Sequence, residues 1–267
     1  MDDQQFRQLL DYFSFSWEGY RRVRKGVKKR ISRHMLQLRC RSVDEYLCSL
    51  DGDEEVRKHS ECLMTVSISR FFRDRFLWKI IEDQIVPCII EERRKKLKFW
   101  CAGCACGEEV YSLKILWKRL EGRFDPMPEL EIWATDVNPL YLRRAQDGKY
   151  SLSSLKEVPQ ELREIYFAPH GEEGLYRIAA SLKKGILWRV HNLLFELGES
   201  NFKIVFLRNS ILTYYKDELK QSAFRKVMDS LAHSAFLIIG SHEKLPIESR
   251  DLVPFSGQSY IFKKIRK

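Results

Sequence analysis

The feature that most constrains the fold is the stretch 99–112, Phe-Trp-Cys-Ala-Gly-Cys-Ala-Cys-Gly-Glu-Glu-Val-Tyr-Ser. An apolar run ends in small residues and glycines, and an amphipathic segment then opens with Glu108 and Glu109. This order predicts a strand, a tight turn and a helix, which is how α/β folds bring bare backbone to a nucleotide-like ligand. A second apolar run, 131–136, ends in Asp136, where a carboxylate can accept hydrogen bonds from both ribose hydroxyls. Together they predict a cofactor that contains a nucleoside.

The residues after the glycines narrow the choice of cofactor. A P-loop requires Gly-Lys-Ser/Thr, which this chain lacks. Dinucleotide-binding folds aim a helix N-terminus at a pyrophosphate, and Glu108 and Glu109 in the first turn would repel that anion. The two acids suit a cationic ligand, and S-adenosylmethionine carries a sulfonium and an ammonium. The alternative is that each glutamate only complements the helix dipole.

Composition excludes several classes of protein. The 267 residues are 44% hydrophobic, which is enough for a packed core. The sequence contains no apolar window of about 18 residues, so we predict no insertion into a membrane. The first five residues are polar and acidic, unlike a signal peptide, and the odd number of cysteines, seven, indicates reduced thiols in a cytoplasmic protein. Cys101, Cys104 and Cys106 have ligand-like spacing but lack a second pair of ligands, so we predict small residues in a turn and no metal.

The net charge of +10 is concentrated near the N-terminus. Eight cations crowd one segment: Arg21, Arg22, Arg24, Lys25, Lys28, Lys29, Arg30 and Arg33. Apolar residues recur through it at steps of three or four, which predicts an amphipathic helix with its apolar stripe inward. The basic face has three interpretations: a solvated face, a docking site for an acidic protein, or a contact for nucleic acid. We predict an acidic protein partner and no nucleic acid.

The order of elements predicts two parts joined by a linker. Residues 1–75 form an all-helical domain, 76–96 a linker helix and 97–267 an α/β domain with a mostly parallel sheet covered on both faces. The expected strands are 97–103, 131–136, 186–190, 203–208, 235–240 and 259–264. The expected helices of the second part are 107–121, 138–147 and 216–231. Prolines and glycines break the pattern over 148–184, which predicts an inserted subdomain with a small antiparallel sheet.

Eight motifs in order resemble those of the CheR-type chemotaxis receptor methyltransferases, and the likeness runs over nearly the full length. They occupy 65–73, 102–112, 134–137, 145–150, 166–167, 192–194, 207–215 and 240–243. The resemblance implies a small N-terminal helical domain followed by a Rossmann-like class I methyltransferase domain with a small inserted β subdomain. It also implies transfer of the methyl group of S-adenosylmethionine to the side-chain carboxylate of a receptor glutamate, with S-adenosylhomocysteine as product. We expect a monomer.

The same resemblance implies the site residues. The cofactor-binding set, with the glycine of the turn, is Ser67, Ser69, Arg73, Gly103, Glu109, Asp136, Asn192, Leu193, Arg208 and Asn209. Arg73 and Tyr214 resemble the residues beside the transferred methyl group and are the predicted catalytic residues. A glutamate carboxylate is already a nucleophile at neutral pH, so the reaction needs alignment and exclusion of water rather than a general base. We expect Arg73 to hold the acceptor carboxylate, Asp136 the ribose and Glu109 the amino group of the methionine moiety.

Departures from the family pattern leave alternatives open. Ala105 and Cys106 replace Ser-Thr in the glycine turn, which removes two hydroxyls, and Ser67 replaces an asparagine. One extra residue after Asn209 leaves Tyr214 and Tyr215 as candidates for the active-site ring. The alternative functions are methyl transfer to another protein or a small carboxylate, and a non-catalytic scaffold that binds S-adenosylmethionine. Whether the insert binds a receptor tail peptide stays open.

Overall fold

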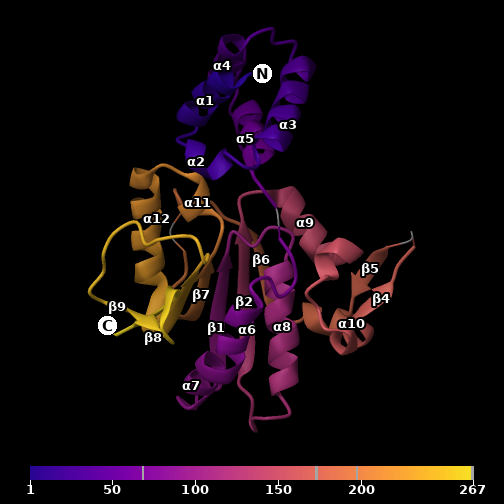
Figure 1. The fold of residues 1–267 in the computed structure, drawn as a ribbon, viewed down its shortest axis with the longest axis vertical. Coiled ribbons are helices and arrows are strands. Elements are labelled where there is room, and N and C mark those ends of the chain that lie inside the picture. Colours follow the sequence, from indigo (N-terminus) through magenta and orange to yellow (C-terminus); the bar gives the residue numbers. More distant parts are fainter. Residues whose placement is uncertain (68, 172–173, 197, 266–267) are drawn as a thin grey trace.

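The N-terminal part is a bundle of helices in the computed structural model, which describes residues 1–67, 69–171, 174–196 and 198–265. Its helices are α1 (Asp3–Tyr12), α2 (Trp17–Tyr20), α3 (Arg24–Gln37), α4 (Val43–Gly52) and α5 (Glu54–Met64) (Figure 1). Val27 and Ile31 of α3 are buried among apolar residues of the neighbouring helices, as the inward stripe predicts. Side chains of Asp2, Ser42 and Asp53 cap α1, α4 and α5 by accepting backbone N–H bonds.

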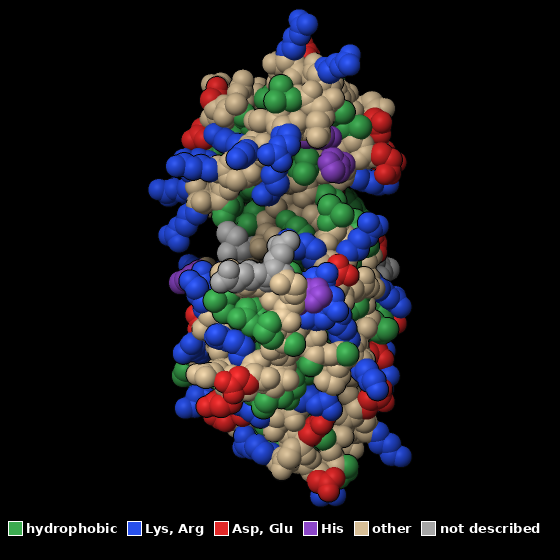
Figure 2. Space-filling model, turned by 90° about the vertical axis from the view of Figure 1, so that its right-hand side faces the viewer, with side chains coloured by type: hydrophobic (Ala, Val, Ile, Leu, Met, Phe, Trp, Pro, Cys, Tyr) green, Lys and Arg blue, Asp and Glu red, His purple; other side chains and the backbone are tan. Residues whose placement is uncertain are grey.

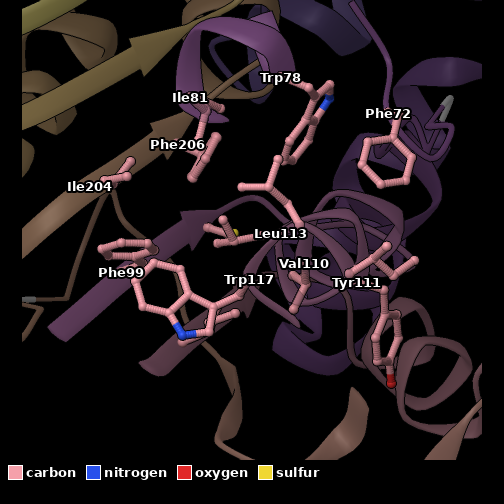
Figure 3. Packing of buried hydrophobic residues seen from close by; sticks show 14 of the residues in the cluster. Phe72, Trp78, Ile81, Phe99, Val110, Tyr111, Leu113, Trp117, Ile204 and Phe206 are labelled. Atoms are coloured by element: carbon pink, nitrogen blue, oxygen red, sulfur yellow. The ribbon is translucent and has the colours of Figure 1, made fainter. Parts of the chain in front are cut away.

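The next segment packs against the sheet of the second part. It consists of α6 (Arg75–Ile80), a π-helical turn (Ile81–Ile85) and α7 (Val86–Ile90). Figure 3 shows Trp78 and Ile81 directed toward Phe206, and the rings of Trp78 and Phe206 stack with centroids 6.1 Å apart. Most of the 76–96 segment, interpreted from the sequence as a linker helix, therefore contributes side chains to the core of the α/β part.

The second part is built on a seven-stranded, mostly parallel sheet in the order β6-β2-β1-β7-β8-β10-β9. The strands are β1 (Lys96–Ala102), β2 (Glu129–Asp136), β6 (Ile186–Val190), β7 (Phe202–Leu207), β8 (Leu231–Ile239), β9 (Leu252–Phe255) and β10 (Gln258–Lys264). Strand β10 is antiparallel to both β8 and β9. The covering helices include α8 (Glu108–Leu120), α9 (Pro139–Asp147) and α12 (Asp217–Ser230), and apolar clusters fill both faces. The predicted α/β class is confirmed.

The insert is a small separate layer at the side of the main sheet (Figure 1). Strands β3 (Lys149–Ser151), β4 (Phe167–Pro169) and β5 (Leu175–Ile178) form an antiparallel sheet in the order β3-β5-β4. A helix, α10 (Gln160–Tyr166), and 3-10 turns at Leu152–Leu155 and Ala180–Lys183 complete it. The small antiparallel sheet agrees with the expectation from the sequence, whereas α10 was not anticipated. No helix in the described ranges combines the length and hydropathy needed to cross a bilayer.

Hydrogen bonds join the helical bundle to the α/β part above the carboxyl ends of the central strands. The Ser16 N–H donates to the Tyr214 carbonyl (2.7 Å), and the Lys216 N–H donates to the Ser14 carbonyl (2.9 Å). On the opposite side of this junction, the Asn138 side chain donates to the Cys62 carbonyl (3.2 Å). These bonds hold the helical bundle over the edge of the sheet where α/β folds bind their ligands.

Candidate active site

The turn after β1 has the tight geometry that its glycines predict. Gly103 adopts φ +78° and Gly107 φ +86°, values that disfavour other residues. The N–H groups of Gly103 and Cys104 both donate to the Thr135 carbonyl, at 2.8 and 2.9 Å. A Cβ on Gly103 would lie 2.7 Å from the Cβ of Ser210. Helix α8 starts directly after Gly107, so strand, turn and helix follow one another as expected.

Asp136 ends β2 with its carboxylate turned toward this turn. Its Oδ2 accepts from the Ala105 N–H and its Oδ1 from the Asn138 N–H, both at 2.9 Å. Asp136 is only 8% exposed, and burial raises the pKa of its carboxyl above the usual value, although these N–H bonds oppose the shift. An ionised carboxylate has about four acceptor positions, so Asp136 keeps the capacity to accept a hydrogen bond from a ligand hydroxyl.

A cavity of about 100 Å³ lies beside Asp136 and is mainly apolar; we call it the apolar cavity. Of the predicted site residues, it is lined by Gly103, Asp136, Asn192, Leu193, Asn209 and Tyr214. Aromatic rings from both parts of the chain close it, including Phe15 and Tyr20 from the helical bundle. An apolar cavity with one carboxylate on its wall has the chemistry that a nucleoside requires.

A second cavity of about 50 Å³ adjoins the first, and its lining is more polar; we call it the polar cavity. Its predicted site residues are Ser69, Arg73, Gly103, Glu109, Arg208 and Asn209. Gly103 and Asn209 line both cavities, as do Val66 and Ala105, so the two form one bipartite site. One half is apolar and carries Asp136, and the other half is charged.

Arg208 organises the charged half. Its guanidinium bridges Glu109, at 2.5 Å, and Asp74, while its side chain is only 4% exposed. Two carboxylates thus compensate one buried cation, which is the condition for keeping such a charge inside a protein. The Nε atom of Arg208 is buried and has no hydrogen-bond partner among the described residues. One donor of this arginine therefore remains for a bound ligand or water.

The site brings Arg73 and Tyr214 close to one another. The Arg73 carbonyl accepts a hydrogen bond from the Trp78 indole (2.9 Å), which fixes the backbone where Arg73 enters the polar cavity. Burial raises the pKa of the Tyr214 hydroxyl, and the positive charge of Arg73 partly offsets that shift. Burial raises the pKa of Tyr215 much further, and its charged neighbours are Glu61 and Asp136 rather than Arg73. Both rings line the apolar cavity, but only Tyr214 is under the influence of Arg73.

The two predicted serines differ in position. Ser69 lines the polar cavity, and its hydroxyl bonds the buried carboxylate of Glu108. Ser67 bonds the thiol of Cys106, and it does not belong to the described lining of either cavity. Cys106 itself is buried, and burial raises its pKa to about 11. In the described ranges, no group of three or more His, Cys, Asp or Glu side chains is arranged to hold a metal ion.

Sequence reasoning missed several residues of the site. The main ones are Phe15, Tyr20, Thr65, Asp74, Trp78, Tyr141 and Glu243. Glu243 accepts from the N–H groups of Asn209 (3.0 Å) and Gly240 (2.6 Å), and so fixes the loop that carries Asn209 with φ +52°. The Gly-Ser-His-Glu motif and the position of Asp74 next to Arg73 were signals in the sequence. Nothing local to Phe15 or Tyr20 indicates that the helical bundle closes this cavity.

Comparison with known proteins identifies the family of this chain. The family described as "CheR methyltransferase, SAM binding domain" matches residues 67–261. The "Chemotaxis protein methyltransferase" of Listeria innocua is 33% identical over 219 residues, which is 82% of this chain and 81% of that protein. The "Chemotaxis protein methyltransferase 2" of Pseudomonas aeruginosa is 27% identical over 241 residues, which is 87% of this chain and 82% of that protein.

A mostly parallel sheet, a glycine turn after its first strand and an acid at the end of the next strand are typical of a fold that binds a nucleoside-containing cofactor. The matched family identifies the class as methyltransferases that use S-adenosylmethionine. More narrowly, the chain belongs to the CheR methyltransferase family. The resemblance noted from the eight motifs is thereby confirmed, and so is the cofactor.

Proposed function

We propose that this enzyme methylates side-chain carboxylates of glutamate residues in a chemotaxis receptor. The observation that carries the proposal is the proximity of Arg73 and Tyr214 beside the bipartite site. The relatives named as chemotaxis protein methyltransferases support this class of acceptor. An arginine suits a carboxylate acceptor because its planar guanidinium can bind both carboxylate oxygens at once.

The residues present fit S-adenosylmethionine in one orientation. The apolar cavity takes the adenosine, with Asp136 toward the ribose hydroxyls and Asn192 and Leu193 beside the adenine. The polar cavity takes the methionine moiety, whose ammonium and carboxylate match Glu109 and the unpartnered donor of Arg208. Gly103 lines both cavities, and a Cβ there would crowd the Ser210 side chain on the wall of the apolar cavity.

The catalytic roles follow from what methyl transfer requires. When bound, S-adenosylmethionine supplies a methyl group on a sulfonium, which a carboxylate oxygen displaces in line. Arg73 positions the acceptor carboxylate without removing its charge, and no side chain has to take up a proton. Tyr214 orients the acceptor through its hydroxyl and lines the site with its ring. The rings from the helical bundle exclude water from the reacting atoms.

The basic segment divides into structural cations and free cations. Arg24 and Lys28 pair with Asp3, and Arg30 donates to the carbonyls of Leu63 (2.8 Å) and Thr65 (2.7 Å). These four contacts tie α3 to its neighbours, so their loss would disturb the bundle itself.

The free cations form a stripe that we call the α3 stripe: Arg22, Lys25, Lys29 and Arg33. All four are exposed and make no hydrogen bond or ion pair to another described residue. Steps of four residues place Lys25, Lys29 and Arg33 along one side of α3 over about 12 Å, and Arg22 lies in the turn just before the helix. Figure 2 shows Lys and Arg side chains over this end of the molecule. We assign the α3 stripe to docking of an acidic, helical receptor segment, since free cations favour such a partner.

The proposed chemistry is tested with S-adenosylmethionine that carries a tritiated methyl group and a cytoplasmic receptor fragment. Glutamate methyl esters release volatile methanol in mild alkali, whereas methyl groups on nitrogen or sulfur stay on the protein. We expect alkali-labile label with the wild type and a loss of at least 100-fold with Arg73→Ala, with a much smaller loss of affinity for S-adenosylhomocysteine. Arg75→Ala is the control, because Arg75 is 70% exposed and pairs with Glu157 on the surface. Alkali-stable label, or full activity of Arg73→Ala, would contradict the proposal.

A further inference from the structure

The two cavities of the bipartite site meet at a junction where the sulfonium of S-adenosylmethionine belongs. In the orientation proposed above, the adenosine occupies the apolar cavity and the methionine moiety the polar cavity, and the sulfur atom joins these two parts of the molecule. Four residues line both cavities and so define the junction: Val66, Gly103, Ala105 and Asn209. None of these four carries a charge, so none of them balances the positive charge of the sulfonium.

The side chain of Ser210 lies at this junction. A Cβ on Gly103 would lie 2.7 Å from the Cβ of Ser210 and 3.1 Å from its Oγ, so the side chain of Ser210 packs over the bare Cα of that glycine. Ser210 follows Asn209 directly in the chain and lines the apolar cavity. The side chain of Ser210 is therefore next to two of the four residues that both cavities share.

The hydroxyl of Ser210 is buried and has no hydrogen-bond partner within the described part of the chain. Ser210 comes directly before the short helix α11 (Ile211–Tyr214), where a serine hydroxyl commonly accepts a bond from a backbone N–H of the first turn. The Ser210 hydroxyl makes no such bond, although the Ser210 carbonyl accepts from the N–H groups of Thr213 and Tyr214, both at 3.1 Å. The backbone of Ser210 is thus fixed, and its hydroxyl remains available to a ligand.

A hydroxyl oxygen suits a sulfonium as its partner. The positive charge of the sulfonium polarises the C–H groups of its methyl and of the neighbouring carbons, and such groups form weak hydrogen bonds to oxygen. In a cavity with little water, the negative end of the hydroxyl dipole also stabilises the cation. S-Adenosylhomocysteine has an uncharged thioether and lacks the methyl group, so it gains much less from the same oxygen.

We propose that the Ser210 hydroxyl binds the sulfonium of S-adenosylmethionine and so raises the affinity for this cofactor relative to S-adenosylhomocysteine. The inference rests on the proposed function and adds to it a residue that distinguishes the cofactor from its product. Because the product carries no sulfonium, the same hydroxyl weakens product inhibition.

The test measures the dissociation constants of S-adenosylmethionine and S-adenosylhomocysteine by calorimetric titration. The proteins are the wild type, Ser210→Ala and Ser230→Ala. Alanine at position 210 keeps the Cβ that packs on Gly103 and removes only the hydroxyl. Ser230 is a matched control, because it is a buried serine whose hydroxyl donates to the Val227 carbonyl (2.7 Å) and it does not belong to the described lining of either cavity.

The melting temperature of each protein without ligand separates a role in binding from a role in folding. Ser210→Ala breaks no hydrogen bond within the described ranges, so it should melt no lower than the wild type. Ser230→Ala loses the bond to Val227 and should melt at a lower temperature. A lower melting temperature of Ser210→Ala would show that its hydroxyl stabilises the fold, which would contradict the assignment.

For Ser210→Ala, we expect the affinity for S-adenosylmethionine to fall about fivefold while the affinity for S-adenosylhomocysteine is unchanged. Ser230→Ala should bind both ligands like the wild type. Equal losses for the two ligands would show that the hydroxyl binds a group that both share, and no loss for either would show that it binds neither. Both results would overturn the sulfonium assignment.

The proposed function fails in a different way. Alkali-stable label on the receptor fragment, together with the expected fivefold effect of Ser210→Ala, would overturn the glutamate acceptor and leave the role of Ser210 standing. A wild type that binds neither S-adenosylmethionine nor S-adenosylhomocysteine would overturn both.

Discussion

Substituting Gly103 tests whether the turn after β1 shapes the cofactor site. In Gly103→Ala the new Cβ lies 2.7 Å from the Cβ of Ser210, whereas ordinary contacts begin at 3.4 Å, so the two must separate by about 0.7 Å. The left-handed backbone at φ +78° costs an alanine roughly 1–2 kcal/mol, and forced repacking adds about 1–3 kcal/mol. Because Gly103 and Ser210 both line the apolar cavity, we expect affinity for S-adenosylhomocysteine to fall at least tenfold.

Gly174 provides a matched control for this prediction. It has the same φ of +78°, but a Cβ there would meet nothing within 4 Å. In Gly174→Ala, the left-handed backbone should therefore lower the free energy of unfolding in urea by about 1–2 kcal/mol. Its affinity for S-adenosylhomocysteine in calorimetric titration should equal that of the wild type. Adding Ser210→Gly to Gly103→Ala removes the clashing carbon and should restore part of the affinity. If Gly103→Ala binds S-adenosylhomocysteine as tightly as Gly174→Ala does, the assignment of the turn to the site is refuted.

Three further predictions follow from buried charges and thiols. Arg208→Lys keeps the positive charge, but an ammonium group cannot bridge two carboxylates as the planar guanidinium does. The affinity of this variant for S-adenosylhomocysteine, measured by calorimetry, should therefore fall about tenfold. Unchanged affinity would show that Arg208 does not contribute to the cofactor site. Burial and the nearby His59 lower the pKa of His34, so the free energy of unfolding should decrease as pH falls below about 6.5 toward that lowered pKa. His34→Gln should flatten this pH dependence. If the free energy of unfolding of His34→Gln depends on pH as that of the wild type does, His34 is excluded as the source. Cys48 is exposed, whereas burial raises the pKa of Cys106 to about 11. Mass spectrometry after brief treatment with iodoacetamide at about pH 7.5 should therefore find the label on Cys48 before Cys106. Early labelling of Cys106 would contradict its burial.

The fold was predictable wherever the signal is local. The apolar run before Gly103 and the amphipathic stretch after Gly107 fix β1 and α8 within a residue or two. Strand β9 was missed because it has only four residues, one of them Pro254, which weakens any strand pattern. Helix α10 was missed because it is a seven-residue element within a segment that prolines and glycines break up.

The candidate site was predictable to the extent that its residues follow strands. Asp136 and Asn209 come directly after apolar runs, and parallel strands bring those ends to one edge of the sheet. Phe15 and Tyr20 are more than 70 residues away from the first strand, and they reach the cavity only because the helical bundle docks on α11. The partition of the basic segment into structural and free cations also depends on tertiary contacts such as those of Asp3, which no pattern in that segment reveals.

The central claim, that the bipartite site holds S-adenosylmethionine with Asp136 toward the ribose, is tested most directly by calorimetric titration with S-adenosylmethionine and S-adenosylhomocysteine. The proteins are the wild type, Asp136→Ala, Asp136→Asn and, as a control, Asp229→Ala, whose carboxylate is exposed on α12. We predict one binding site in the wild type and in Asp229→Ala, and severely weakened binding in both Asp136 variants, with Asp136→Asn still folded. The absence of binding to the wild type, or full affinity of Asp136→Asn and Asp136→Ala, would contradict the account.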